Sequence, residues 1–184
     1  MADPHADFPT CPHGIPCYMT HAELDMLADC ARRVPAGGLI LEVGACYGGS
    51  TVTMALAAPE AIVVSVDFFI WSPLPTMPAS AAQMHANLKA AGVENVAVMD
   101  ADSHRIGRLW SHPVDMLFVD GGHEPQDVRI DLENFGPHAA VVCAHDFGNP
   151  SWDGVEPVVR EFCAAEGFTV AGQVDYLAVL RRNA

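Results

Sequence analysis

The sequence predicts an α/β fold: a doubly wound, seven-stranded sheet that is mostly parallel and ends in an antiparallel hairpin. Its 184 residues suffice for one domain with a substantial core and leave no room for a second. Short apolar runs alternate with stretches of helical periodicity, which is the pattern of parallel strands joined by crossover helices. Only residues 172–175 separate the last two apolar runs, too few for a crossover helix, so those two strands should pair antiparallel.

The chain is expected to begin with an irregular arm over residues 1–19, followed by one domain over residues 20–184. Thr20 and Glu23 have the spacing of a capping box, so a helix should begin there and end at the turn of residues 35–38. Apolar periodicity and turn residues then predict, in order, strand 39–43, helix 50–58, strand 61–66, helix 81–91, strand 95–99, helix 106–110, strand 114–119, helix 125–135, strand 139–144, helix 155–165 and strands 168–171 and 176–180.

A proline-rich segment, residues 71–78, delays the helix for which Ser80 is a good N-cap. We interpret this segment as a lid or binding loop. Four residues in or near it either line a substrate pocket or pack over the sheet edge: Trp71, Met77, Met84 and His85.

The composition is strongly acidic, with 23 Asp and Glu against 9 Lys and Arg and a formal net charge of -14. Such a field repels phosphate backbones and anionic lipids, so we expect neither nucleic acid nor a membrane surface as a partner. Small neutral or cationic molecules are favoured instead. No apolar run is long enough to span a bilayer and no leader segment is recognisable, so a cytoplasmic location is expected.

Six cysteines are scattered along the chain, and we expect them to be free thiols. The arm contains four residue types that can bind zinc: Cys11, His13, Cys17 and His21. Their spacing matches no common structural zinc site. A flexible arm or a cover over the substrate site is therefore the favoured interpretation, with zinc as the alternative.

Acidic or glycine-rich turns follow five consecutive predicted strands, and parallel strands bring such turns to one edge of the sheet. The first turn contains Gly44 and Gly48 but lacks the second glycine of the dinucleotide fingerprint, which disfavours a nicotinamide cofactor. Asp67, at the second strand end, could accept both ribose hydroxyls of a nucleoside. The later strand ends carry Asp100-Ala-Asp102-Ser103, Asp120-Gly-Gly-His123 and His145-Asp146.

These motifs resemble those of the class I S-adenosylmethionine-dependent methyltransferases, whose fold is a Rossmann-like doubly wound sheet. Glu42-x-Gly44-x-x-x-Gly48 is similar to their first motif, and Val66-Asp67 is similar to their acidic second motif. The segments 115–123 and 141–146 are similar to signatures of small O-methyltransferases, a subgroup that includes macrocin O-methyltransferase and is related to catechol O-methyltransferase. The resemblance covers residues 38–182, nearly the whole chain.

The resemblance implies a cofactor site, a metal site and a general base. The metal, Mg²⁺ or Mn²⁺, is expected at Asp120, His145 and Asp146, where it would chelate the acceptor oxygens. His123 stands where the catechol enzymes carry a catalytic lysine and could be the base, with Asp120 and His145 as alternatives. The residues expected around S-adenosylmethionine are Glu42, Gly44, Ala45, Gly48 and Ser50 for the methionine part, Asp67 for the ribose, Asp102 and Ser103 for the adenine edge, and Asp120.

The sequence thus predicts an enzyme that transfers the methyl group of S-adenosylmethionine directly to a small polar acceptor, in the first place a hydroxyl. Two alternatives stay open: a module that binds a nucleoside cofactor without turnover, and a nicotinamide-dependent oxidoreductase. The acceptor, the choice between O- and N-methylation and the oligomeric state, with a homodimer as one alternative, do not follow from the sequence.

Overall fold

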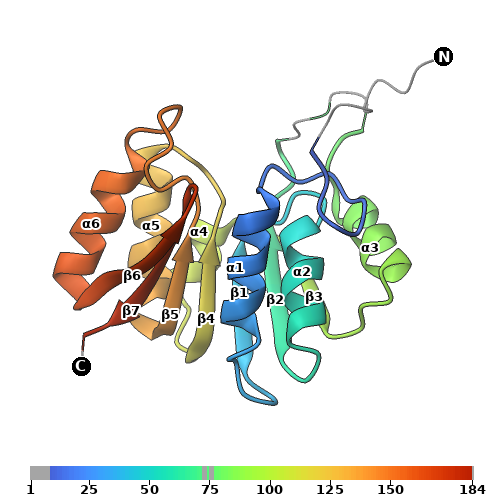
Figure 1. The fold of residues 1–184 in the computed structure, drawn as a ribbon, viewed down its shortest axis with the longest axis horizontal. Coiled ribbons are helices and arrows are strands. Elements are labelled where there is room, and N and C mark those ends of the chain that lie inside the picture. Colours follow the sequence, from blue (N-terminus) through green and yellow to red (C-terminus); the bar gives the residue numbers. More distant parts are fainter. Residues whose placement is uncertain (1–8, 72–73, 75–76, 184) are drawn as a thin grey trace.

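A computed structural model describes residues 9–71, 74 and 77–183. These residues form a seven-stranded sheet with the strand order β3-β2-β1-β4-β5-β7-β6 (Figure 1). All pairings from β3 to β5 are parallel, whereas β7 pairs antiparallel with both β5 and β6. The predicted fold class is therefore confirmed, including the C-terminal hairpin.

The strands lie close to the predicted segments, and most helices do so as well. The strands are β1 (Leu39–Val43), β2 (Ile62–Asp67), β3 (Val96–Asp100), β4 (Val114–Val119), β5 (Ala139–Ala144), β6 (Phe168–Val174) and β7 (Leu177–Arg182). The helices are α1 (His21–Ala31), α2 (Gly49–Ala57), α3 (Ala81–Ala90), α4 (Ser103–Gly107), α5 (Pro125–Phe135) and α6 (Val155–Glu166), with a short 3₁₀ turn, η1 (Gly136–His138), before β5.

One helix boundary was predicted wrongly. The helix expected at residues 106–110 is instead α4, which begins at Ser103 because the Asp102 side chain accepts a hydrogen bond from the main-chain N–H of His104. It ends at Gly107, and the Trp110 indole leaves the helical path to donate to the carbonyl of His112.

An apolar core packs on each face of the sheet. On one face, α1, α2 and α3 pack against alternate strand residues such as Ile40, Met116 and Phe118. On the other, α4, α5 and α6 pack against the intervening residues, such as Leu41 and Leu117. Because the side chains on both faces are buried, these strands appear in the sequence as continuous apolar runs. Among the described residues, no helix is long and apolar enough to cross a membrane.

The loops that follow β1, β2, β4 and β5 all emerge at one end of the sheet, where the arm (blue) also lies (Figure 1). The arm reaches the turn after β1 directly, because a Cβ added at Gly49 would lie 2.9 Å from the Cβ of Cys17. Part of the predicted lid, residues 72–73 and 75–76, lies outside the described residues.

Candidate functional site

The glycine turn after β1 is locked onto the ends of β4 and β2. Gly44 has a φ of +89°, and a Cβ at this position would collide with the main-chain oxygen of Asp120. Only glycine allows so close an approach of two strand ends. The Asp67 carboxylate accepts hydrogen bonds from the N–H groups of Ala45 (2.8 Å) and Cys46 (2.7 Å) in the same turn. The ends of three strands, β1, β2 and β4, are therefore joined by direct contacts.

Glu42 lies beneath this turn and is fully buried. Its carboxylate accepts hydrogen bonds from Ser50 and Thr51, each at 2.5 Å, and from Ser65. Burial raises the pKa of Glu42 to about 7 in spite of these three hydroxyl donors, because they do not replace the lost hydration of the charge. Glu42 and the buried Ser50 thus support the turn from below, since neither carboxylate nor hydroxyl reaches the surface.

The end of β3 lies beside the end of β2, since Asp67 and Asp100 are paired in the sheet. Asp102 caps α4, and Ser103 donates a hydrogen bond to Asp131 (2.8 Å), so both side chains hold the start of that helix. Two large apolar side chains, Phe68 and Met99, are exposed at these two strand ends. Neither residue was predicted from the sequence to belong to the site, although Phe68 directly follows the acid at the end of β2.

Two carboxylates and an imidazole meet at the ends of β4 and β5. Asp120, His123 and Asp146 each offer one side-chain atom that could bind a metal. These three atoms all lie within 4.8 Å of one another. The closest pair is His123 Nδ1 and Asp146 Oδ2, at 2.9 Å. Burial would raise the pKa of Asp146, but the nearby imidazoles of His123 and His145 outweigh it and hold this pKa well below its ordinary value.

The loop after β5 fixes this cluster from the outside. Asn149 donates a hydrogen bond to the Oδ1 atom of Asp146 (2.6 Å), which leaves Oδ2 facing His123. The Trp152 ring covers the His123 ring, with centroids 4.8 Å apart and an interplanar angle of 33°. The His123 side chain stays 27% exposed, so solvent or a ligand can reach it.

His145 lies deeper, between carboxylates on both sides. Its side chain is 8% exposed, with Nδ1 at 3.0 Å from Asp120 Oδ1 and Nε2 at 3.5 Å from Glu23 Oε1. Neither ring nitrogen makes an aligned hydrogen bond in spite of these short distances. Burial lowers the pKa of His145, but the nearby Asp120 and Asp146 carboxylates and Glu23 together raise it well above its ordinary value.

Glu23 was predicted only as a capping residue, and that role is confirmed by its hydrogen bond with the N–H of Thr20 (2.7 Å). The same buried carboxylate also accepts from the N–H of Tyr176 (2.8 Å) and faces His145. No sequence signal links residues so far apart in the chain.

The other candidates are placed less favourably. In the described part of the chain, the cluster of Asp120, His123 and Asp146 is the one group with metal-binding spacing, so Cys11, His13, Cys17 and His21 are not brought together as a zinc site. All six cysteines are free. Of the residues considered for a substrate pocket, Met84 is fully buried against Gly48. Trp71 is exposed, with its ring 6.3 Å from that of Tyr18.

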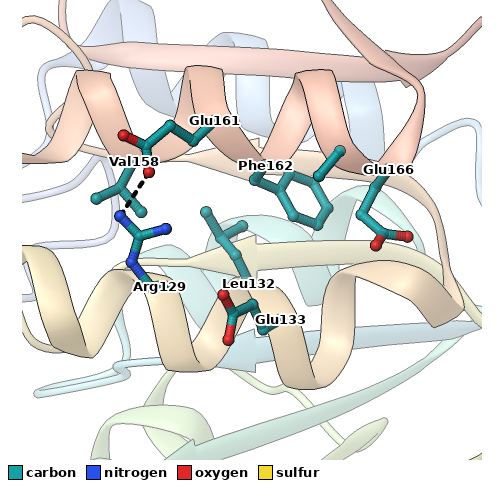
Figure 2. A pocket seen from close by; sticks show the side chains of 8 residues that line it. Arg129, Leu132, Glu133, Val158, Glu161, Phe162 and Glu166 are labelled. Carbon is teal, nitrogen blue, oxygen red and sulfur yellow. Dashed lines mark hydrogen bonds and ion pairs between the residues drawn. The ribbon is translucent and has the colours of Figure 1, made fainter.

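A separate groove of about 330 Å³ runs between α5 and α6 (Figure 2). An ion pair of 2.6 Å between Arg129 and Glu161 crosses it. Its floor is apolar and its rim is acidic, and it lacks histidine, serine and cysteine: the residues that line it are Arg129, Leu132, Glu133, Val158, Glu161, Phe162, Ala165 and Glu166. The groove therefore lacks the pairing of carboxylates with imidazoles found at the strand ends.

Comparisons with known proteins agree with this geometry. A family model described as a methyltransferase domain matches residues 41–147. No curated protein matches the sequence.

Solved structures share the fold at low sequence identity. The O-methyltransferase TomG from Streptomyces achromogenes, involved in tomaymycin synthesis and solved in complex with SAM, is 22% identical, with 90% of this chain and 82% of that chain covered and a TM-score of 0.66. The O-methyltransferase NovP is 15% identical (91% and 82% covered, TM-score 0.67). An rRNA methylase from Streptococcus thermophilus is 14% identical (90% and 98% covered, TM-score 0.58).

Proposed function

Because the chain belongs to the methyltransferase-domain family, within the class I S-adenosylmethionine-dependent enzymes, we propose that it methylates a hydroxyl group of a small polar acceptor. The observation that carries this proposal is the direct contact between the glycine turn, Asp67 and the end of β4. This contact brings Asp67, the proposed ribose ligand, and a cluster of carboxylates and imidazoles to the same end of the sheet.

The cofactor would lie along the glycine turn. Gly44, Ala45 and Gly48 offer main chain without bulky side chains to the methionine part, and Asp102 and Ser103 stand where the adenine edge is expected. Asp67 already accepts from the N–H groups of Ala45, Cys46 and Phe69, which leaves about one of the four acceptor positions of a carboxylate for a ribose hydroxyl. Glu42 and Ser50 would act indirectly, by holding the turn in shape.

When bound, S-adenosylmethionine supplies a methyl carbon that its positive sulfur has already activated. The protein then needs chiefly to align the acceptor oxygen and to remove its proton. The groups available for this task are Asp120, His123 and His145. His123 is the more exposed of the two imidazoles, and its role is either to take this proton or to bind a metal.

A divalent metal fits the cluster. Asp120 and Asp146 supply the hard carboxylate oxygens that Mg²⁺ and Mn²⁺ prefer, and His145 or His123 supplies a nitrogen. When bound, the ion would chelate the acceptor oxygens and lower the pKa of the attacking hydroxyl. Asn149 supports this arrangement, because it orients Asp146 from behind.

The acidic charge of the chain favours a small acceptor over an RNA. The net charge of -14 repels phosphates, and Lys89 is the sole lysine. We therefore propose a neutral or cationic small molecule as the acceptor, in contrast to the rRNA methylases that share the fold.

Calorimetric titration with S-adenosylhomocysteine, followed by a methyl-transfer screen of small hydroxyl compounds by mass spectrometry, tests the proposal. We expect binding of S-adenosylhomocysteine, no binding of NAD, and a methylated product in the screen. His123→Ala should lose turnover and keep S-adenosylhomocysteine binding. Tight binding of NAD would support the oxidoreductase alternative, and cofactor binding without any product would support the non-enzymatic module.

A further inference from the structure

We propose that His123, and not His145, is the nitrogen ligand of a divalent metal whose other protein ligands are Asp120 and Asp146. This mixed nitrogen and oxygen site binds Mn²⁺ more tightly than Mg²⁺. The catalytic role of this metal depends on the proposed methyl transfer, but the binding of the metal and the identity of its ligands do not depend on it.

The donor spacing fits one ion. Adjacent ligands of an octahedral ion at about 2.1 Å lie roughly 3 Å apart. His123 Nδ1 and Asp146 Oδ2 are 2.9 Å apart, and the three donor atoms of the cluster all lie within 4.8 Å of one another. Asp120 and Asp146 follow neighbouring parallel strands, since Val119 pairs with Ala144. The three donor atoms are therefore close enough together to bind one ion.

The loop of residues 121–123 is shaped to bring His123 to this point. A Cβ at Gly122 would lie 2.6 Å from Asp127 Oδ2, so only glycine lets the loop press against the first turn of α5. Trp152 then covers the His123 ring. Ligands held by neighbouring side chains in this way lose little freedom when an ion binds.

His145 is oriented differently. Its Nδ1 atom faces Asp120 and Asp146, but its Nε2 atom faces Glu23 and its side chain is nearly enclosed. The group with metal-binding spacing in the described ranges contains His123 and not His145. The contact with Glu23 and the deeper burial of His145 therefore make it the less suitable ligand.

The unsatisfied state of His145 is an independent sign that a further group completes the site. Buried polar atoms in proteins almost always have hydrogen-bond partners, yet neither His145 nitrogen has an aligned one. Its Nδ1 atom lies 3.0 Å from Asp120 and 3.6 Å from Asp146, so it borders the cluster. An ion bound between these two carboxylates would change the hydrogen-bond partners of the His145 ring.

The donor set decides which ion is preferred. Mg²⁺ favours oxygen ligands and gives up water reluctantly, whereas imidazole suits the transition metals. We expect wild-type protein to bind Mn²⁺ at least about 10-fold more tightly than Mg²⁺. His123→Asp, which makes the donor set all oxygen, should reduce this preference.

The test is titration of metal-free protein with Mn²⁺, followed by electron paramagnetic resonance with spin-echo detection of nitrogen coupling. We expect an imidazole nitrogen signal in the wild type and in His145→Ala, and its loss together with at least about 10-fold weaker binding in His123→Ala. His13→Ala, an exposed histidine of the arm, is the matched control and should behave as wild type.

Loss of the nitrogen signal in His145→Ala but not in His123→Ala would overturn the assignment, as would wild-type protein without a nitrogen signal or without Mn²⁺ binding. S-adenosylhomocysteine titration of the same samples separates the two proposals. If the protein binds S-adenosylhomocysteine but the Mn²⁺ experiment fails, the metal assignment is wrong and the methyl-transfer proposal stands. If the Mn²⁺ experiment succeeds but S-adenosylhomocysteine does not bind, the metal site stands and the methyl-transfer proposal is wrong.

Discussion

Replacing Glu42 by Gln should change the pH dependence of stability. Glu42 is fully buried, and its pKa rises from an ordinary 4.5 to about 7. The folded protein thus keeps this proton at pH values where the unfolded chain has lost it, so stability falls as the pH rises from about 4.5 to 7. A rise of about 2.5 pH units, at 1.36 kcal/mol per unit, gives a loss of about 3 kcal/mol. Gln is neutral at every pH and avoids this loss.

Urea unfolding of wild type and Glu42→Gln between pH 4.5 and 8 measures the effect. The difference in unfolding free energy should grow by about 3 kcal/mol in favour of Glu42→Gln up to pH 7 and stay constant above it. Other buried acids, such as Asp131 with a pKa of about 6, are present in both proteins and cancel in the difference. Glu60→Gln removes an exposed carboxylate and is the matched control. Parallel pH profiles of wild type and Glu42→Gln would refute the reasoning.

Two further substitutions test the turn and the ribose contact. Gly44→Ala should cost about 3 kcal/mol or more, from a positive φ and a collision with the β4 main chain, whereas Gly92→Ala has a similar φ with no atom nearby and should cost about 1 kcal/mol. Thermal unfolding measures both, and equal effects would contradict the close approach. Asp67→Asn should weaken S-adenosylhomocysteine binding about 10- to 100-fold, because hydrogen bonds to a charged group are worth about 1.5–3 kcal/mol. The exposed Asp25→Asn serves as its calorimetric control, and an unchanged affinity in Asp67→Asn would argue against a ribose contact.

The central strands of the sheet could be predicted because they are buried on both faces. The segments 114–119 and 139–144 match β4 and β5 residue for residue, since burial in a parallel sheet makes a strand apolar along its whole length. The short helix α4 was misplaced because its start depends on one capping contact of Asp102 and not on apolar periodicity. Local propensity is too weak a signal for a helix of five residues.

The candidate site could be predicted down to the strand ends but not to the individual side chains. Asp120 and Asp146 were expected to meet because parallel strands bring their carboxyl ends together, and they do. Asp146 has a φ of +59°, and the neighbouring His145 is buried with its Nε2 atom facing Glu23, which the sequence pattern did not indicate. Glu23 faces His145 from a helix 122 positions earlier in the sequence, a relation that no local pattern carries.

Electrostatics links the acidic chain to the proposed metal. Glu23, Asp120 and Asp146 surround one imidazole, His145, and together raise its pKa. Three carboxylates around a single imidazole favour a positive sulfonium nearby and disfavour a negatively charged acceptor oxygen. A divalent ion beside a hydroxyl acceptor would offset this negative charge and help the hydroxyl to lose its proton at neutral pH. An amine acceptor attacks as a neutral group and would gain far less from the same ion, so the proposed metal and the proposed hydroxyl acceptor follow from the same arrangement of charges.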